Sequence, residues 1–214
     1  ILENMEYCAM DGENSQISWD PVHGGKRAWI VFEDDETYDV GPDSGCRFEE
    51  ISKRMLGGEY YPSDAIAVTG EFRTENRQVR RGDRLLQKAP LFGKLGGPNL
   101  SSIVEIVAAE KCEAIVSYAE QLNKGKNQSQ KYCHFGYVTT TQHHGRGIWQ
   151  AKLEAFEGRL TLRVWSTSMP NSIWFWLGLP IARFLQLRAR QRAVEEFRKV
   201  ESLLAASSRA TGEQ

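Results

Sequence analysis

Two adjacent histidines, His143 and His144, are the residues of this sequence best suited to acid–base chemistry. An imidazole titrates near neutral pH, so either one could serve as a general base. Adjacent side chains of a strand point to opposite faces, and no Asp, Glu or Cys nearby completes a ligand set, so no metal site is predicted. We expect no cofactor, and we expect exposed turn residues here, with a catalytic role as the alternative.

A second group of side chains could hold a small molecule, because aromatic rings and a few polar groups are the usual lining of a pocket. The candidate walls are Tyr118, Tyr137, Trp149 and Phe184, and the candidate polar contacts are Ser166, Arg183 and Gln186. Arg183 and Gln186 are one helical turn apart and could share a polar target. That target is either a carbonyl or carboxylate of the sheet, which makes Arg183 a latch, or the polar end of a ligand. For the aromatic residues the alternative is ordinary core packing.

The most apolar run, Ile173 to Leu179, is too short to cross a bilayer. Its aromatic residues Trp174, Phe175 and Trp176 could cap the end of the fold, form a dimer contact or enter a membrane interface. We therefore expect a monomer or homodimer, with no transmembrane segment but with peripheral membrane contact as an alternative.

The basic residues that follow belong to one helical stretch: Arg183, Arg188, Arg190 and Arg192. Arg188, Arg190 and Arg192 do not share one helical face, so a solvated face is predicted. The net charge of -1 gives no general attraction to nucleic acid, and no nucleic-acid partner is expected.

The 214 residues, of which 41% are hydrophobic and 26% charged, are typical of one globular domain. We expect an irregular extension over 1–26, a single domain over 27–208 and a frayed tail over 209–214. The four cysteines form no CxxC motif, and the start has neither the basic nor the apolar region of a signal peptide. Reduced cysteines and a cytoplasmic location are therefore expected.

The first half of the chain predicts strands separated by one helix. Strands are expected at Ala28 to Phe32 and at Ala65 to Phe72, and the range Tyr38 to Gly45 is expected to hold a strand and then a turn. A solvated turn is expected at Asp34, Asp35 and Glu36. Phe48, Ile51 and Met55 predict a helix from about Arg47 to Leu56 that Gly57-Gly58 ends. The glycine-rich stretch 93–98 is predicted to be a flexible loop.

The second half predicts an antiparallel meander and a terminal helix. Sheet-like runs occupy Ile103 to Ala109, Ala114 to Ala119 and Tyr132 to Thr141, followed by an alternating hairpin over 149–164 with small inward residues Ala151 and Ala155. Small residues on the inside of a curved sheet can leave an internal space.

The last segment predicts a short turn or helix that Gly178 ends and then a helix beginning at Pro180. Its apolar stripe is Ile181, Leu185, Ala189, Ala193, Phe197, Val200 and Leu204. The stripe is long enough to require an apolar partner, and the concave face of the sheet is the obvious one.

This element order is that of a helix-grip α+β fold, a curved antiparallel sheet wrapped around a long C-terminal helix. Three stretches of residues resemble an uncharacterised bacterial and plant domain family placed with the Bet v 1/START-like superfamily. They are Val40-Gly41-Pro42 before the helix at Phe48, Phe135-Gly136-Tyr137 running to Thr140-Thr141, and Ser168-Met169-Pro170 followed by Pro180, Arg183 and Gln186.

The chain departs from that family where His-Pro-Glu and Gly-Glu-Glu motifs would follow the threonine strand, because Gln142 to Trp149 keeps a histidine but no carboxylate. The resemblance implies a cavity for a small hydrophobic or lipid-like ligand between sheet and helix. A cyclase- or hydrolase-like enzyme with a histidine base is the alternative, and a membrane or protein interaction module is a further one. We favour binding over catalysis.

Overall fold

The computed structural model describes residues 32–44, 46–90, 99–116, 128–140, 145–170 and 173–211. Its elements, in chain order, are β1 (Phe32–Pro42), α1 (Arg47–Leu56), β2 (Ala67–Thr69), α2 (Glu71–Thr74), β3 (Arg84–Pro90), β4 (Asn99–Val116), β5 (Gln128–Thr139), β6 (Gly145–Phe156), β7 (Arg159–Pro170) and α3 (Ile173–Thr211). The strands form one antiparallel sheet in the order β1-β7-β6-β5-β4-β3-β2. This confirms the predicted helix-grip α+β fold.

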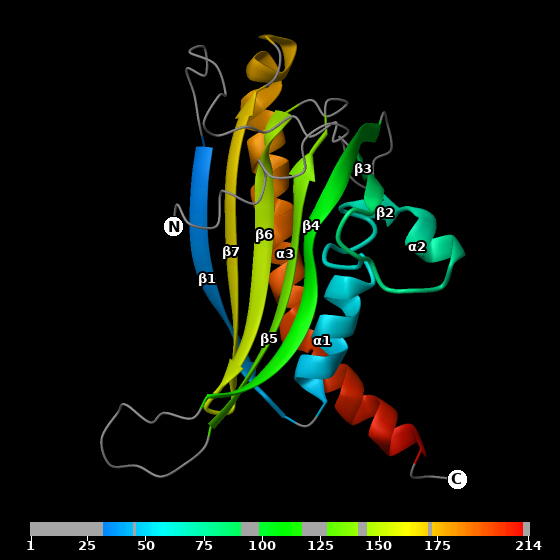
Figure 1. Ribbon diagram of the computed structural model, residues 1–214, viewed down its shortest axis with the longest axis vertical. Helices are drawn as coiled ribbons and strands as arrows, with labels where there is room; N and C mark the ends of the chain where they lie inside the picture. Colours follow the sequence, from blue (N-terminus) through cyan, green and yellow to red (C-terminus); the bar gives the residue numbers. More distant parts are fainter. Residues whose placement is uncertain are drawn as a thin grey trace.

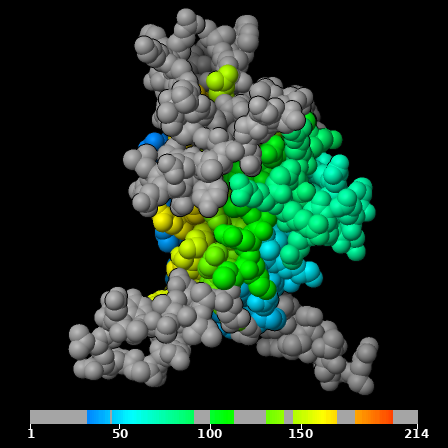
Figure 2. All heavy atoms as spheres, viewed as in Figure 1, coloured from blue at the N-terminus to red at the C-terminus, as the bar shows by residue number. Residues whose placement is uncertain are grey.

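Figure 1 shows α3 running along one face of the curved sheet, with α1 packed beside it near one end. The helix α3 contacts β1 and β7, whereas α1 contacts β4, β5 and β6. The two helices together therefore cover the inner face of the sheet. The region around α2 projects from the side of the sheet on which β2 and β3 lie (Figure 2).

The hairpin of β6 and β7 confirms the hairpin that the alternating residues over 149–164 predict. Leu153 pairs with Leu162 across the two strands, and both are fully buried. The connecting residues Glu157 and Gly158 have φ values of 51° and 74°. Positive φ at both central residues gives the tight turn whose twist matches two antiparallel strands.

The helix α1 begins and ends where the sequence predicts. Phe48, Ile51 and Met55 are buried along one side, which turns toward the sheet and α3. Gly58, with φ at 71°, follows the last turn, and its N–H donates to the Met55 carbonyl. A glycine adopts this backbone conformation without strain.

The terminal helix differs from its prediction at its start. It is one element from Ile173 to Thr211 that contains Pro180, so the break expected at Gly178 is wrong. A proline removes one backbone hydrogen bond, but neighbouring turns can carry a helix through such a position. The predicted stripe is confirmed at Ala189, Ala193, Phe197 and Val200, which are buried, whereas Ile181 is 63% exposed.

Two further predictions for the first half are wrong. Asp34, Asp35 and Glu36 lie inside β1 and not in a turn, because their charges meet arginines of β7 and α3. The strand expected from Ala65 to Phe72 is shortened to β2, and Phe72 belongs to the short helix α2. The strand predicted over Ala28 to Phe32 lies mostly outside the described residues, as does the loop 93–98.

Candidate functional site

Four inward side chains form one row across four neighbouring strands. Asp34 of β1 pairs in register with Ser166 of β7, Ser166 with Trp149 of β6, and Trp149 with Tyr137 of β5. Alternate residues of a strand share a face, so the buried Trp149 places this row on the inner side of the sheet, beneath α3. The row is charged at the β1 end and aromatic at the β5 end.

An aromatic cluster surrounds Trp149. Tyr60 meets the indole edge-on, with ring centroids 4.6 Å apart, and Tyr137 stacks on it at 5.2 Å. Tyr61 lies at 5.7 Å from the same ring, and Phe197 of α3 meets Tyr60 at 5.5 Å. Tyr60 and Tyr61 come from the loop that follows α1, so this loop, α3 and the sheet all contribute to the cluster.

Asp34 is the electrostatic centre of the other end of the row. Its carboxylate accepts two hydrogen bonds from Arg183 of α3, one of them at 2.6 Å, and one from Arg190 at 3.2 Å. The Ser166 hydroxyl donates to the same carboxylate at 3.1 Å. Burial raises the pKa of Asp34, but the hydrogen bonds and charges of the two arginines outweigh it, so the pKa lies below its ordinary value.

Arg190 links this charged end to the aromatic end. Its side chain is 4% exposed, and its Nη1 atom lies 3.6 Å from a Glu36 carboxylate oxygen, beyond hydrogen-bonding distance. Burial raises the pKa of Tyr60 and the pKa of Tyr61 well above the ordinary value, and the positive charge of Arg190 offsets part of each rise. The guanidinium therefore lies within electrostatic range of both phenols.

Hydrogen bonding is complete at one edge of the cluster. Burial raises the pKa of Tyr137 to about 12, and hydrogen bonds with Gln87 and with Tyr61 offset part of that effect. The Tyr137 hydroxyl is thus partnered from both β3 and the loop after α1. This edge of the cluster needs no further polar group.

Of the six buried side-chain atoms of the described residues that have no hydrogen-bond partner, three belong to this site: the Tyr60 hydroxyl, Trp149 Nε1 and Arg190 Nη1. Their residues are 2%, 7% and 3% exposed. Buried polar groups of folded proteins are nearly always hydrogen-bonded, and each exception calls for an explanation. Three such atoms around one aromatic cluster make this interior, which we call the inner cluster (Asp34, Tyr60, Tyr61, Tyr137, Trp149 and Arg190), the candidate binding site.

The structure brings four of the seven residues predicted from the sequence to this interior. Tyr137, Trp149 and Ser166 belong to the row, and Arg183 reaches its end through Asp34. The pairing of Arg183 with a carboxylate of the sheet matches the latch alternative. Ala151 and Ala155 are buried on the same face, and the expectation that they border a ligand space stays a prediction.

Phe184 and Gln186 do not join the site. Phe184 is 61% exposed and lies nine residues before Ala193, which places it on the opposite side of α3. Gln186 is exposed and does not share the target of Arg183, although its spacing puts it on the helical side of Ala189 and Ala193. Tyr118, His143 and His144 lie outside the described residues.

Sequence reasoning missed Asp34, Tyr60, Tyr61 and Arg190. Arg190 was assigned to a solvated face, yet it lies three and seven residues before Ala193 and Phe197, which places it on their helical side. That spacing was an available signal. The two adjacent tyrosines follow the Gly57-Gly58 stop in a segment without periodicity, and only their aromatic character marked them.

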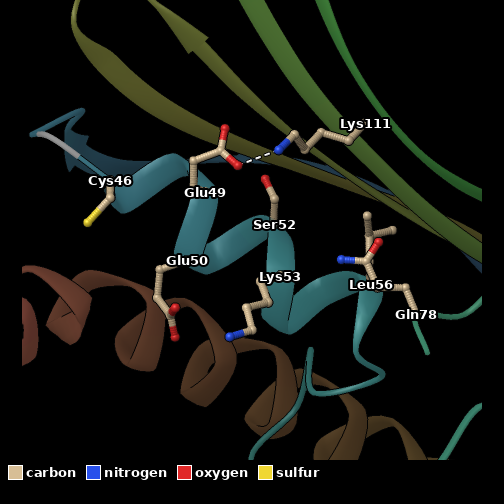
Figure 3. A pocket seen from close by; sticks show the side chains of 8 residues that line it. All are labelled: Cys46, Glu49, Glu50, Ser52, Lys53, Leu56, Gln78 and Lys111. Carbon is tan, nitrogen blue, oxygen red and sulfur yellow. Dashed lines mark hydrogen bonds and ion pairs between the residues drawn. The ribbon is translucent and has the colours of Figure 1, made fainter. Parts of the chain in front are cut away.

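A separate cleft of about 280 Å3 lies beside α1. Figure 3 shows Glu49 and Lys111 paired across it, between α1 and β4. The other lining residues are Cys46, Glu50, Ser52, Lys53, Leu56 and Gln78. Because charges of both signs line this open cleft, it suits an apolar ligand less well than the inner cluster.

The described residues also bear on two other kinds of site. None of their His, Cys, Asp and Glu side chains gather in groups of three or more that could hold a metal ion. Within the same residues, no helix combines the length and the apolar character needed to cross a membrane. The side chains of Trp174, Phe175 and Trp176 lie outside this description.

Comparison with known proteins gives a family and distant structural similarity. A model described as "Domain of unknown function (DUF1990)" matches residues 31–196. No curated protein matches the sequence.

Three solved structures illustrate the distant similarity. Ara h 8.0201 is 14% identical with a TM-score of 0.43, over 79% of this chain and 98% of that one. Hypothetical protein jhp0584 from Helicobacter pylori is 10% identical with a TM-score of 0.43, over 86% and 96% of the two chains. Major latex-like protein 151 from Panax ginseng is 13% identical with a TM-score of 0.34, over 73% and 97%.

Proposed function

The chain belongs to the DUF1990 family, and we propose that it binds a small, largely apolar molecule at the inner cluster, between the sheet and α3. One observation carries the proposal: three deeply buried donors without partners stand around an aromatic cluster. Binding sites for small molecules typically combine aromatic walls with a few placed polar groups. A core that served packing alone would gain stability from apolar residues at these positions.

The fold supplies a means of holding such a molecule. The walls come from β5, β6 and the loop after α1, which pack together, while α3 closes the site from the other side. Arg183 and Arg190 tie α3 to Asp34 at one end of the row. A molecule beneath α3 would therefore be enclosed by elements that are fixed to one another.

Native mass spectrometry of the protein purified from its own source tests the proposal. We expect a second mass species, heavier by one small molecule, that organic extraction converts to the apo protein. The extract then identifies the ligand. Displacement of anilinonaphthalene sulfonate by that extract, in wild type but not in Trp149→Ala, would place the molecule at the inner cluster. If the native protein carries no molecule and the dye does not bind, the proposal fails.

A surface role is the second candidate, because one observation favours it. Ile181 and Phe184 are 63% and 61% exposed and lie one turn apart on α3, so they form an apolar pair on its outer side. An exposed apolar patch is typical of interaction sites. Sedimentation with vesicles of neutral and anionic phospholipid, compared between wild type and Phe184→Ser, tests this role. The enzyme hypothesis, which rests on His143 or His144, and the cytoplasmic location stay predictions.

A further inference from the structure

The unpartnered atoms of the inner cluster share one chemical property. The indole N–H of Trp149 and the guanidinium N–H groups of Arg190 can only donate hydrogen bonds. The Tyr60 hydroxyl stays protonated at any physiological pH, because burial raises its pKa far above the ordinary value. It is therefore also available as a donor. The unmet hydrogen-bonding capacity of the site is therefore mainly a capacity to donate, since only the Tyr60 oxygen can also accept.

The acceptors at the site are already engaged. The Asp34 carboxylate receives Arg183, Arg190 and Ser166, and Tyr137 is bonded with Gln87 and Tyr61. None of the three donor atoms makes a hydrogen bond in the structure, although Glu36 lies 3.6 Å from Arg190 Nη1 and the Tyr38 hydroxyl also interacts with Arg190. For Tyr60 and Trp149, the described residues supply no acceptor, so a bound molecule would bring it.

Tyr60 is the link among the residues that carry the three donors. The Tyr60 and Trp149 rings are 4.6 Å apart between centroids, and the Arg190 charge acts on the Tyr60 phenol. One oxygen, or two oxygens of one group, placed at this end of the aromatic cluster could receive hydrogen bonds from several of them. The rest of the molecule would then contact the rings of Tyr137 and Trp149.

From this arrangement we infer that the ligand is an apolar molecule that carries an acceptor oxygen, a carbonyl or a carboxylate, which receives hydrogen bonds from Tyr60, Trp149 and Arg190. The inference rests on the proposed function and specifies its ligand class. It disfavours amines, because an ammonium would bring further donors close to a buried guanidinium, and it disfavours pure hydrocarbons, because they leave all three donors unpaired. Asp34 and Glu36 together balance the charges of Arg183 and Arg190, so a neutral carbonyl and an anionic carboxylate share the required chemistry.

Three probes of similar shape test the inference by equilibrium dialysis. Benzophenone has a carbonyl between two phenyl rings, diphenylmethane has the rings without oxygen, and diphenylacetate adds a carboxylate. We expect benzophenone or diphenylacetate to bind about tenfold more tightly than diphenylmethane, the effect of one buried hydrogen bond. The affinities of benzophenone and diphenylacetate, compared with each other, show whether the site prefers a neutral carbonyl or an anionic carboxylate.

The matched variants are Tyr60→Phe and, as a control on the same residue type, Tyr132→Phe on β5. Tyr60→Phe should remove about tenfold of the affinity for the oxygen-bearing probe and leave diphenylmethane unchanged. It should not lower the melting temperature of the apo protein, because the hydroxyl it removes has no partner. If the hydroxyl instead stabilises the fold, Tyr60→Phe should lower the melting temperature of the apo protein. Tyr132→Phe should alter none of the affinities.

The outcomes separate this inference from the proposed function. Equal affinities for benzophenone, diphenylacetate and diphenylmethane, or an oxygen-dependent affinity that survives Tyr60→Phe, would overturn the inference and leave the proposed function standing. Failure of all three probes to bind, with no molecule on the native protein, would overturn both.

Discussion

At Asp34, one carboxylate holds two arginines that are seven residues apart on α3 and therefore lie on one side of that helix. We expect Asp34→Asn to lower the free energy of unfolding by about 3 kcal/mol, because the buried Arg190 then keeps only the longer contact with the half-exposed Glu36 carboxylate. Chemical denaturation at neutral pH measures the loss. Asp35→Asn is the matched control, because the pair of Asp35 with Arg163 is about half exposed and contributes little.

The same carboxylate gives the stability a defined pH dependence. The pKa of Asp34 in the folded protein lies below its ordinary value of 3.8, which the unfolded chain should show. Its contribution is therefore present above that value and is lost as the pH falls through the folded pKa. The difference in unfolding free energy between wild type and Asp34→Asn should be constant from pH 7 to about 5 and should shrink below about 4. A constant difference down to pH 3 would contradict the assignment.

Arg183 tests whether a latch can be separated from a binding residue. Its guanidinium is 24% exposed and pairs with Asp34, so Arg183→Met should lower the free energy of unfolding by about 1–2 kcal/mol with or without a bound probe. Affinity for benzophenone should stay within about twofold of wild type, because the three donors are untouched. A variant of normal apo stability that no longer binds the probe would make Arg183 a recognition residue instead.

The residues of the site show why sequence alone predicted only part of it. Tyr137, Trp149 and Ser166 stand on strands whose alternation marks one face, so their inward direction was predictable. The partner of Arg183 was not, since Asp34 lies 149 residues earlier in the chain. Without that partner, three successive acidic residues have the composition of a solvated turn. Their charges become compatible with a strand only once β7 and α3 are in place.

Among the elements, α1 is tied to both β1 and α3 by one buried side chain. Arg47, 1% exposed, donates to the carbonyl oxygens of Val40 and Pro42 at the end of β1 and of Phe197 and Arg198 on α3. Gly41, with φ at 116°, allows this approach, because a Cβ there would lie 2.9 Å from the guanidinium. One side chain therefore joins three elements, and Arg198 of α3 adds hydrogen bonds to the Asp39 carbonyl of β1.

We expect Arg47→Met to lower the free energy of unfolding by about 3–5 kcal/mol, because it leaves buried carbonyls unpaired. Arg54→Met on the same helix is the control, since the pair of Arg54 with Glu50 is a partly exposed i,i+4 contact worth about 0.5 kcal/mol or less. Urea denaturation of the two variants gives both values. Equal effects of the two substitutions would show that the Arg47 junction does not carry the stability assigned to it.

Phe197 measures how tightly α3 packs on the inner face. The side chain is 1% exposed and meets the Tyr60 ring, so Phe197→Ala should lower the free energy of unfolding by about 3–5 kcal/mol. Phe184→Ala, on the exposed side of the same helix, should change it by less than about 0.5 kcal/mol. A loss below about 1 kcal/mol for Phe197→Ala would mean that the predicted stripe is not the packing face.

Elements were predictable where a local signal sets both their type and their limits. The Gly57-Gly58 pair ends α1, and the Glu157-Gly158 turn fixes the hairpin of β6 and β7. The start of α3 was not predictable, because a glycine and a proline close together mark a break in most sequences. Here the helix continues through Pro180. The limits of β2 depend likewise on its pairing with β3, which no local pattern encodes.

At the scale of the whole molecule, α3 is attached to the sheet at two separate places. Arg183 and Arg190 bind Asp34 toward the start of the helix, while Phe197 and the carbonyls that Arg47 holds fix it further along. The inner cluster shares Asp34, Trp149 and Tyr137 with the row, and its Tyr60 contacts Phe197, so it adjoins both attachments. Access to a site enclosed in this way requires one attachment to open, and the one at Asp34 is the weaker, because Ile181 and Phe184 beside it are exposed.

Amide hydrogen exchange with mass spectrometry can test this division of α3. Backbone amides open locally with free energies that follow the density of buried contacts, so 181–187 should exchange faster than 193–200 in the wild type. Asp34→Asn should speed exchange in 181–187 and leave 193–200 nearly unchanged, because Phe197 and Arg47 still hold the latter. Under conditions where the protein stays folded, Arg47→Met should speed exchange in 193–200 and leave 181–187 nearly unchanged.

A bound oxygen-bearing probe should slow exchange in 181–187 in the wild type, since it favours the closed arrangement of Arg190 and Asp34. Uniform changes along the whole helix in both variants would show that α3 opens as one unit and that the Asp34 attachment does not control access by itself.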